Sequence, residues 1–413
     1  TSENLPLIPY VNRRQKLKIG MSDKKGLPMK NSEIENDLEQ FQELLNCPEQ
    51  NWLLGAGISY SAKIPLMYPL TSRIMELIQE DAEAVNLITK IKSELPPNLH
   101  IEHILSHLGD YSAIASRTLK KEIEICKENF TLDCIEKIHN KILKYIADTI
   151  RYGYVEKPEK IIGDKDNFIV DIKEHFNFIN TIFYSLRAGI NERRKPIRLF
   201  TTNYDTLLED ALALNRIPYW DGFSGGAVAY RSYQYGQIEP MNDAKAHIIK
   251  MHGSIDWFQN DDGSLWRVRD RDTYPIKNNR VLIYPQSTKY IATQKDPFSA
   301  QFDLLRKSLN SLSYHVLIVC GYSFGDEHIN QEINLSLSNP NNKTVLLAFC
   351  EEVDNKIPEV LDVWRCSDWG ERVYVATQNG LYVGSKSPIK RKDEYDDSWT
   401  FSGMTKVLKE GVL

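Results

Sequence analysis

Three apolar, strand-like runs in this chain each end directly at a glycine or polar turn, and this pattern constrains the fold more than any other. They are residues 53–59 (LLGAGIS), 199–205 (LFTTNYD) and 248–254 (IIKMHGS). In an open α/β sheet, ligands bind beyond the carboxyl ends of the strands. The sequence therefore predicts a sheet whose strand-end turns together form one ligand site.

The fold class follows from the segments around these turns. Strands are predicted at about residues 51–54 and at 197–200, 247–251, 281–284, 315–320 and 344–349, and a helix at 70–78 follows the first glycine turn. Residues 80–195 have few glycines and carry amphipathic helical runs, with a break near 153–163. We expect an α/β protein with a Rossmann-like parallel sheet and a large helical insertion or subdomain.

These patterns divide the chain into four parts. Residues 1–31 are predicted to form a flexible arm, and a capping box of Ser32 and Glu35 predicts a helix from there. The sheet core is expected at 32–79 and 196–350, with the helical insertion at 80–195. Residues 351–413 are expected to hold a hairpin, because Gln378-Asn379-Gly380 is a favoured turn, and a charged tail. A Gly-, Tyr- and Ser-rich stretch at 221–236 could cover a ligand.

Composition excludes several classes of protein. The formal charge of -5 over 413 residues gives no general attraction to nucleic acid. The six cysteines include no C-x-x-C pair, which disfavours a zinc ribbon and a disulfide framework. We find no signal peptide and no apolar run long enough to span a membrane, so we predict a soluble cytoplasmic protein. His103 and His107 have the spacing of a shared metal, but no zinc-protease glutamate follows, and no metal is expected.

Two glycine turns are candidates for phosphate binding. Gly55 and Gly57 would let backbone N–H groups approach a pyrophosphate, and the following helix adds a positive end. A plain strand-to-helix turn explains the same residues, and the spacing is not the full G-x-G-x-x-G of a dehydrogenase. Gly321 and Ser323 follow a second strand and could meet a phosphate or ribose, while Asp326 could equally be a helix cap.

Asn203, Asp205 and His252 are the candidate chemical groups. An Asn side chain donates and accepts hydrogen bonds, so it can bind a ribose hydroxyl and position a water. Asp205 could hold a ligand or cap the next helix. A histidine exchanges protons near neutral pH, which suits acid/base catalysis, although many such histidines only satisfy a backbone carbonyl.

Taken in chain order, the four motifs resemble the sirtuin family: residues 55–59 with 61–62 and 64–65, then 202–205, 252–254 and 321–323. The resemblance covers about residues 47–79 and 196–350. It implies an NAD site that contains Gly55, Ala56, Gly57, Ser59, Thr202, Gly321 and Ser323. It also implies that Asn203 lies beside the nicotinamide ribose, that Asp205 faces the nicotinamide amide, and that His252 is the catalytic base.

The sequence departs from the protein deacylases of that family in three places. No cysteine occurs between 253 and 284, where their zinc module would lie, and Leu66-Met67-Tyr68 replaces their Asp-Phe-Arg. Residues 281–286 (VLIYPQ) lack their Phe-Gly-Glu. With these losses and the helical insertion, the chain looks like the sirtuin-like NAD hydrolases of bacterial anti-phage systems.

That resemblance implies an abortive-infection effector in which water replaces the acyl oxygen, so that NAD+ is the substrate and is cleaved to ADP-ribose and nicotinamide. It also implies a homo-oligomer and a separate sensor protein, a HerA-type ATPase ahead of a short argonaute. Two other functions stay open: an NAD-dependent protein deacylase or ADP-ribosyltransferase, and a non-catalytic module that senses NAD or ADP-ribose.

Overall fold

The computed structural model describes residues 28–186, 195–232, 243–260, 263–269, 279–282, 298–310, 313–390 and 397–410, with only the backbone at 28–32 and 279–282. Several predicted segments fall partly outside these residues: residues 1–27 of the arm, the end of the stretch 221–236, residues 187–194 of the helical insertion, residues 283–286 of the segment 281–286, and part of the charged tail.

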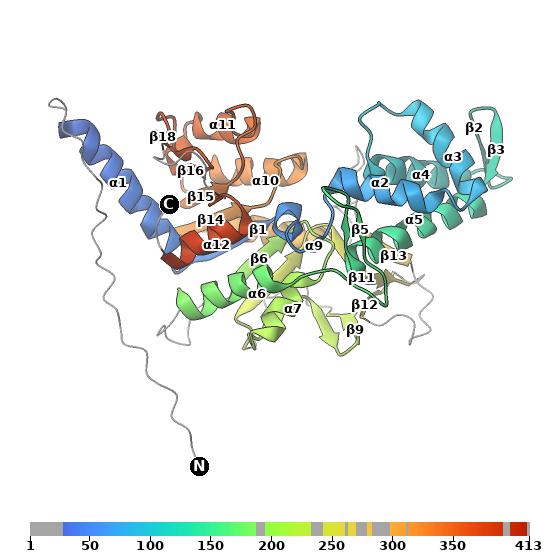
Figure 1. Cartoon of the computed structure of the whole chain (residues 1–413), viewed down its shortest axis with the longest axis horizontal. Coiled ribbons are helices and arrows are strands. Elements are labelled where there is room, and N and C mark those ends of the chain that lie inside the picture. Colours follow the sequence, from blue (N-terminus) through green and yellow to red (C-terminus); the bar gives the residue numbers. More distant parts are fainter. Residues whose placement is uncertain are drawn as a thin grey trace, which may run out of the picture.

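Helices and strands are interspersed along the described residues (Figure 1). The helices are α1 (Pro28–Leu45), α2 (Met67–Ile78), α3 (Ala82–Glu94), α4 (Ile101–Ala115), α5 (Leu132–Tyr152), α6 (Lys173–Asn180), α7 (Leu207–Leu214), α9 (Phe298–Leu309), α10 (Glu327–Leu337), α11 (Glu359–Arg365) and α12 (Phe401–Glu410), with short turns η1 (Ala56–Ser59), η2 (Thr181–Ser185) and η3 (Gly370–Arg372). None of these described helices is long and apolar enough to cross a membrane.

The main sheet has nine strands in the order β18-β17-β16-β15-β14-β1-β6-β10-β7. Its strands are β1 (Gln50–Leu54), β6 (Ile197–Thr201), β7 (Tyr219–Trp220), β10 (Ala246–Lys250), β14 (His315–Cys320), β15 (Thr344–Phe349), β16 (Val373–Ala376), β17 (Gly380–Val383) and β18 (Ile389–Lys390). Every pairing from β16 to β7 is parallel, and β17 and β18 add an antiparallel edge. The predicted α/β class with a parallel sheet is confirmed.

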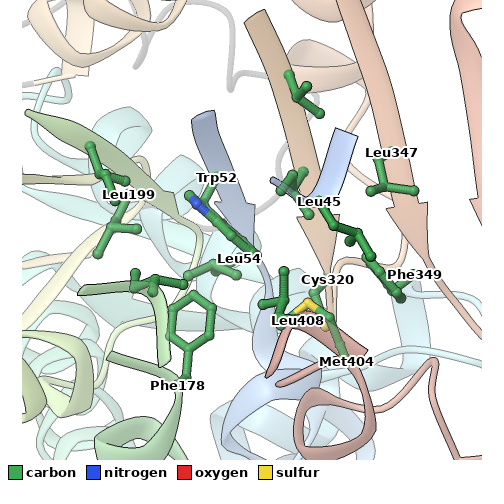
Figure 2. Packing of buried hydrophobic residues seen from close by; sticks show 14 of the residues in the cluster. Leu45, Trp52, Leu54, Phe178, Leu199, Cys320, Leu347, Phe349, Met404 and Leu408 are labelled. Atoms are coloured by element: carbon green, nitrogen blue, oxygen red, sulfur yellow. The ribbon is translucent and has the colours of Figure 1, made fainter. Parts of the chain in front are cut away.

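Both faces of the sheet are covered by helices, because its central strands carry apolar side chains on both faces. Trp52 and Leu54 of β1 point into a core that includes side chains of α1, α6, α7 and α12 (Figure 2). Leu53, between them, points into a second core with side chains of α9, α10 and α11. Alternate residues of a strand face opposite sides of a sheet, so one continuous apolar run fills both cores.

The helical region predicted within residues 80–195 has a separate core. Side chains of α2, α3, α4 and α5 pack together, and Leu207 and Ile255 of the sheet domain join them. Figure 1 shows these helices gathered at one end of the molecule with the hairpin of β2 (Glu122–Ile125) and β3 (Glu128–Thr131). The predicted break is present, because α5 ends at Tyr152 and α6 begins only at Lys173. α6 belongs instead to the core under the sheet, where Phe178 packs edge-on against Trp52.

The remaining strands form small antiparallel sheets. β8 (Phe223–Gly225), β9 (Val228–Arg231), β11 (Gly253–Gln259), β12 (Leu265–Val268) and β13 (Asn279–Leu282) form one sheet, and β4 (Tyr154–Val155) pairs with β5 (Ile161–Ile162). The predicted turn at Gln378-Asn379-Gly380 does connect two antiparallel strands, β16 and β17. The start of α1 was predicted wrongly: it begins at Pro28, so Ser32 lies inside the helix. A proline is well tolerated in the first turn of a helix, where its missing N–H costs nothing.

Candidate active site

The strand order creates a crevice between β1 and β14. After β1, the chain adds β6 and β10 on one side of it, and then returns to add β14 and β15 on the other side. In doubly wound sheets, ligands bind at such a topological switch point, outside the carboxyl ends of the strands. The turns that follow β1 and β14 therefore lie where a ligand is expected, and these are the two predicted glycine turns.

The two glycine turns pack directly against each other. Gly55 N–H donates to the Cys320 carbonyl at 3.0 Å, and Gly57 N–H donates to the Gly321 carbonyl at 2.8 Å. A Cβ on Gly55 would lie 2.4 Å from the Gly321 oxygen, and Gly321 itself has φ +66. The three glycines are therefore required for backbone-to-backbone packing, and two of their N–H groups are already bonded within the protein.

Other groups of these turns face solvent. Ala56, Gly57 and Ser323 are exposed, while Gly55 and Ser59 are buried. The Ser323 hydroxyl accepts the Gly325 N–H at 3.3 Å. The turns thus offer a mostly backbone surface beside the crevice.

The predicted Asn203 and Asp205 are joined through Ser59. Asn203 Nδ2 donates to Ser59 Oγ at 3.0 Å, and Ser59 donates to Asp205 Oδ2 at 2.8 Å. The other Asp205 oxygen accepts the N–H of Leu207, the first residue of α7, at 3.0 Å. Asp205 therefore holds the start of α7, as its sequence allowed, and also belongs to the polar network.

The amide oxygen of Asn203 has no hydrogen-bond partner among the described residues, although it is buried. Its orientation is fixed by chemistry, because the Ser59 hydroxyl proton goes to Asp205 and Ser59 can then only accept from Asn203. A buried acceptor without a partner carries an energetic cost unless something binds it. Asn203 Oδ1 is thus ready to accept from a hydroxyl or a water at the crevice.

His175 on α6 completes this network and was not predicted. Its Nε2 lies 3.4 Å from Ser59 Oγ, and the side chain is fully buried. Burial lowers the pKa of His175 to about 4, with the negative Asp205 acting in the opposite direction, so the imidazole is neutral near pH 7. Nothing in the sequence near residue 175 marks it as a site residue.

A buried ion pair stabilises the loop that carries Asn203 and Asp205. Lys250, the last residue of β10, donates to the Asp205 carbonyl and lies 3.3 Å from Glu209 Oε1. Both side chains are almost fully buried, and burial raises the pKa of Glu209 while Lys250 lowers it. The backbone that carries Asn203 and Asp205 is therefore fixed to the strand that carries His252.

His252 lies just beyond β10 and meets a residue from the other side of the crevice. Its Nε2 is 2.7 Å from Asp326 Oδ2. Asp326 is also the N-cap of α10, as its sequence allowed, and accepts the His328 N–H at 3.2 Å. The sequence suggested each residue separately, but not the contact between them.

The helical region touches the site through Tyr204. Its hydroxyl donates to Glu102 of α4 at 3.2 Å. A cavity of about 300 Å³ is lined by apolar side chains, among them Phe168 and Val170, and by the charged side chains of Asp205, Asp256 and Arg269. Thr202 is half-buried and donates its N–H to the Leu54 carbonyl at 3.1 Å, which joins β6 to β1.

The histidines considered for a metal have protein partners. The His100 N–H donates to His103 Nδ1 at 3.2 Å, and His107 Nε2 lies 3.4 Å from Glu94. Over the described part of the chain, no group of three or more His, Cys, Asp or Glu side chains could hold a metal ion.

Fold and site together define an α/β protein with a polar ligand site at the switch point of a parallel sheet. Residues 197–366, less than half of the chain, match the family model described as a SIR2-like domain. The matched segment includes β6, β10, β14 and the residues Asn203, His252 and Gly321. No curated protein matches the chain.

The chain also has distant likenesses to solved structures. A Sir2 homologue solved as an NAD complex has 10% sequence identity and a TM-score of 0.40, covering 90% of this chain and 94% of that one. Two mutants of a Sir2 homologue, solved as ADP ribose complexes, have 11% and 13% identity and TM-scores of 0.38 and 0.36. They cover 90% and 78% of this chain and 95% and 88% of their own.

Proposed function

We propose that this protein is an NAD+ hydrolase that releases nicotinamide and leaves ADP-ribose. The observation that carries the proposal is the buried, unpartnered amide oxygen of Asn203, held at the switch-point crevice by Ser59. The match of residues 197–366 to a SIR2-like domain supports a dinucleotide as the ligand. The residues present suit this substrate, because the crevice combines exposed backbone at Ala56 and Gly57 with polar side chains further along the same edge.

Cleavage of a glycosidic bond passes through a state with positive charge on the sugar ring, which nearby polar groups can stabilise. Asn203 Oδ1 can accept from a ribose hydroxyl or orient the attacking water. His252 can take a proton from that water, and the adjacent carboxylate of Asp326 favours the charged imidazole that results. Asp205 can receive the amide of nicotinamide only by sharing the oxygen that Ser59 now occupies.

The test is release of nicotinamide from NAD+, measured by chromatography, by the purified chain alone and with candidate partners. We expect Asn203→Ala to lower kcat by about 1,000-fold, within the range known for loss of one stabilising group at a reacting centre. Asn129→Ala, on the exposed β3, is the matched control and should retain full activity. Equal release by Asn203→Ala and the control would refute the proposal.

The same assay separates the alternatives. A deacylase or an ADP-ribosyltransferase would release nicotinamide only when an acylated peptide or an acceptor protein is added. A sensor would bind NAD+ in calorimetry and release nothing. We propose peptide-independent release, because the sequence lacks the Phe-Gly-Glu that the resemblance associates with acyl-lysine binding.

We further propose a role in anti-phage defence, in which the chain forms a homo-oligomer and a HerA-type ATPase controls it, with a short argonaute as the second choice. The helical region offers the surface for such control, since Tyr204 connects it to the site loop. Loss of intracellular NAD+ after phage infection, in cells that carry this chain and the product of the neighbouring gene, is the expected result. Phage resistance with unchanged NAD+ would contradict it.

A further inference from the structure

The contact between His252 and Asp326 connects parts of the sheet that are not adjacent. His252 follows β10 and Asp326 follows β14, and these strands are separated by β1 and β6. The loop from Gly321 to Asp326 must therefore pass across the carboxyl ends of the intervening strands. Both side chains are less than one-tenth exposed, so their contact lies in a region with little water.

The loop that carries Asp326 is fixed to α10. The Tyr322 hydroxyl shares its proton between the Asp326 carbonyl and Asn330 Oδ1, both at 3.1 Å. Asn330 Nδ2 donates to the Phe324 carbonyl at 2.7 Å. Tyr322 and Phe324 also pack into the core on that face of the sheet. Asp326 is therefore presented to His252 from a rigid support.

The two carboxylate oxygens of Asp326 have separate contacts. Oδ1 accepts the N–H of His328 and so caps α10, while Oδ2 faces His252 Nε2 at 2.7 Å. The cap would need only one oxygen, and it leaves the second oxygen pointing in a fixed direction. A carboxylate at that position favours an imidazole whose Nε2 carries the proton, which leaves the lone pair on Nδ1.

We propose that Asp326 is a positioning residue that holds His252 in the Nε2–H tautomer and so prepares Nδ1 to take a proton. Asp326 does not touch the reacting atoms and acts through His252. The inference rests on the proposed function for its catalytic consequence, but the tautomer itself can be measured without any activity.

Asp326→Asn is the decisive variant, because asparagine caps helices as well as aspartate does. Its amide oxygen stays on the His328 N–H, since an NH₂ group there would face another donor. The NH₂ group then faces His252 Nε2, where a second N–H cannot be accommodated. We expect the histidine to change to the Nδ1–H tautomer. Asp326→Ser, which also caps and cannot reach His252, replaces it if the first variant is unstable in thermal unfolding.

The readout is nitrogen-15 NMR of the imidazole at pH 8, with the His252 signals assigned by their loss in His252→Gln. Asp81→Asn is the matched control: Asp81 is the N-cap of α3, accepts the Ala84 N–H at 3.1 Å, and also has a basic partner, Lys141 at 2.7 Å. It should leave the His252 signals unchanged. An unchanged tautomer in Asp326→Asn would overturn the inference.

Kinetics test the catalytic consequence. If NAD+ is hydrolysed, Asp326→Asn should lower kcat by about 100-fold or more, as expected for a misdirected general base, and leave KM within about twofold. A changed tautomer with unchanged kcat would overturn the positioning role. If the wild-type chain hydrolyses no NAD+ with any partner, the proposed function fails, and the NMR result still decides whether Asp326 sets the tautomer.

Discussion

The turns after β1 and β14 and the turn after β6 are built in different ways. Those after β1 and β14 meet through their backbones, with glycines where any side chain would collide. The turn after β6 is instead held by buried polar side chains, because Asn203 and Asp205 both bond Ser59, and Lys250 at the end of β10 pairs with Glu209 of α7. The glycine turns set the shape of the crevice, and the polar side chains supply groups that can bind, orient or move protons. Shape and chemistry are thus separable by mutation.

The largest effect on stability is expected at the turns after β1 and β14, which meet through their backbones. Gly55→Ala would place a methyl group 2.5 Å from the Tyr322 Cα, and neither backbone can move without breaking the hydrogen bonds between the turns. We expect the free energy of unfolding in urea to fall by about 3 kcal/mol. Gly226→Ala, where a Cβ meets nothing within 4 Å, is the control and should change it by less than about 0.5 kcal/mol. Similar curves for both variants would show that the turns do not pack as described.

A smaller effect is expected from the buried polar network of Ser59, Asn203 and Asp205. Ser59→Ala removes the link between Asn203 and Asp205 and leaves two more buried polar groups without a partner. We expect transition-state stabilisation to fall by about 2 kcal/mol, which would be measured as about a 30-fold fall in kcat/KM for NAD+. Ser61→Ala, whose hydroxyl contacts Glu174 at an exposed position, is the neighbouring control. A fall in kcat/KM of the same size in the control would show that the loss does not come from the polar network.

The smallest effect is a dependence of stability on pH, which comes from His175 in the polar network. His175 is neutral in the folded protein because its pKa is lowered to about 4, whereas the unfolded chain binds a proton near pH 6.5. Stability from this residue is therefore present above pH 6.5 and is lost as the pH falls toward 4. Between pH 7.5 and 5.5, wild type should lose about 1 kcal/mol more than His175→Gln, measured by urea unfolding at each pH. Equal losses of stability in the two proteins would contradict a buried, neutral His175.

Much of the sheet could be predicted from the sequence, because its central strands are buried on both faces and appear as continuous apolar runs. β14 and β15 have the bounds that were predicted, and β1 and β6 differ by one residue at an end. The start of α1 was missed because several residues before Ser32 can also begin a helix. Helix ends depend on competing local hydrogen bonds that a sequence pattern does not rank.

The site was predictable in its parts and not in its contacts. Asn203, Asp205 and His252 follow strands, so their common edge could be foreseen. His175 lies 116 residues from Ser59 and has no motif around it, and Lys250 reads as one polar residue at the end of a strand. The sequence also could not tell that the Gly55 and Gly57 N–H groups bond the loop after β14, since a turn that packs and a turn that binds phosphate both need glycine.

The pairing of β1 with β14 also has a consequence for synthesis. Asn51 pairs with Leu317, so the crevice joins the first strand of the sheet to a strand that is synthesised much later. Domains generally begin to fold while the chain is still being synthesised, and contacts between distant residues form late. While Gly321 is still inside the ribosome, the growing chain has no crevice. A product truncated before Gly321 could not form the site.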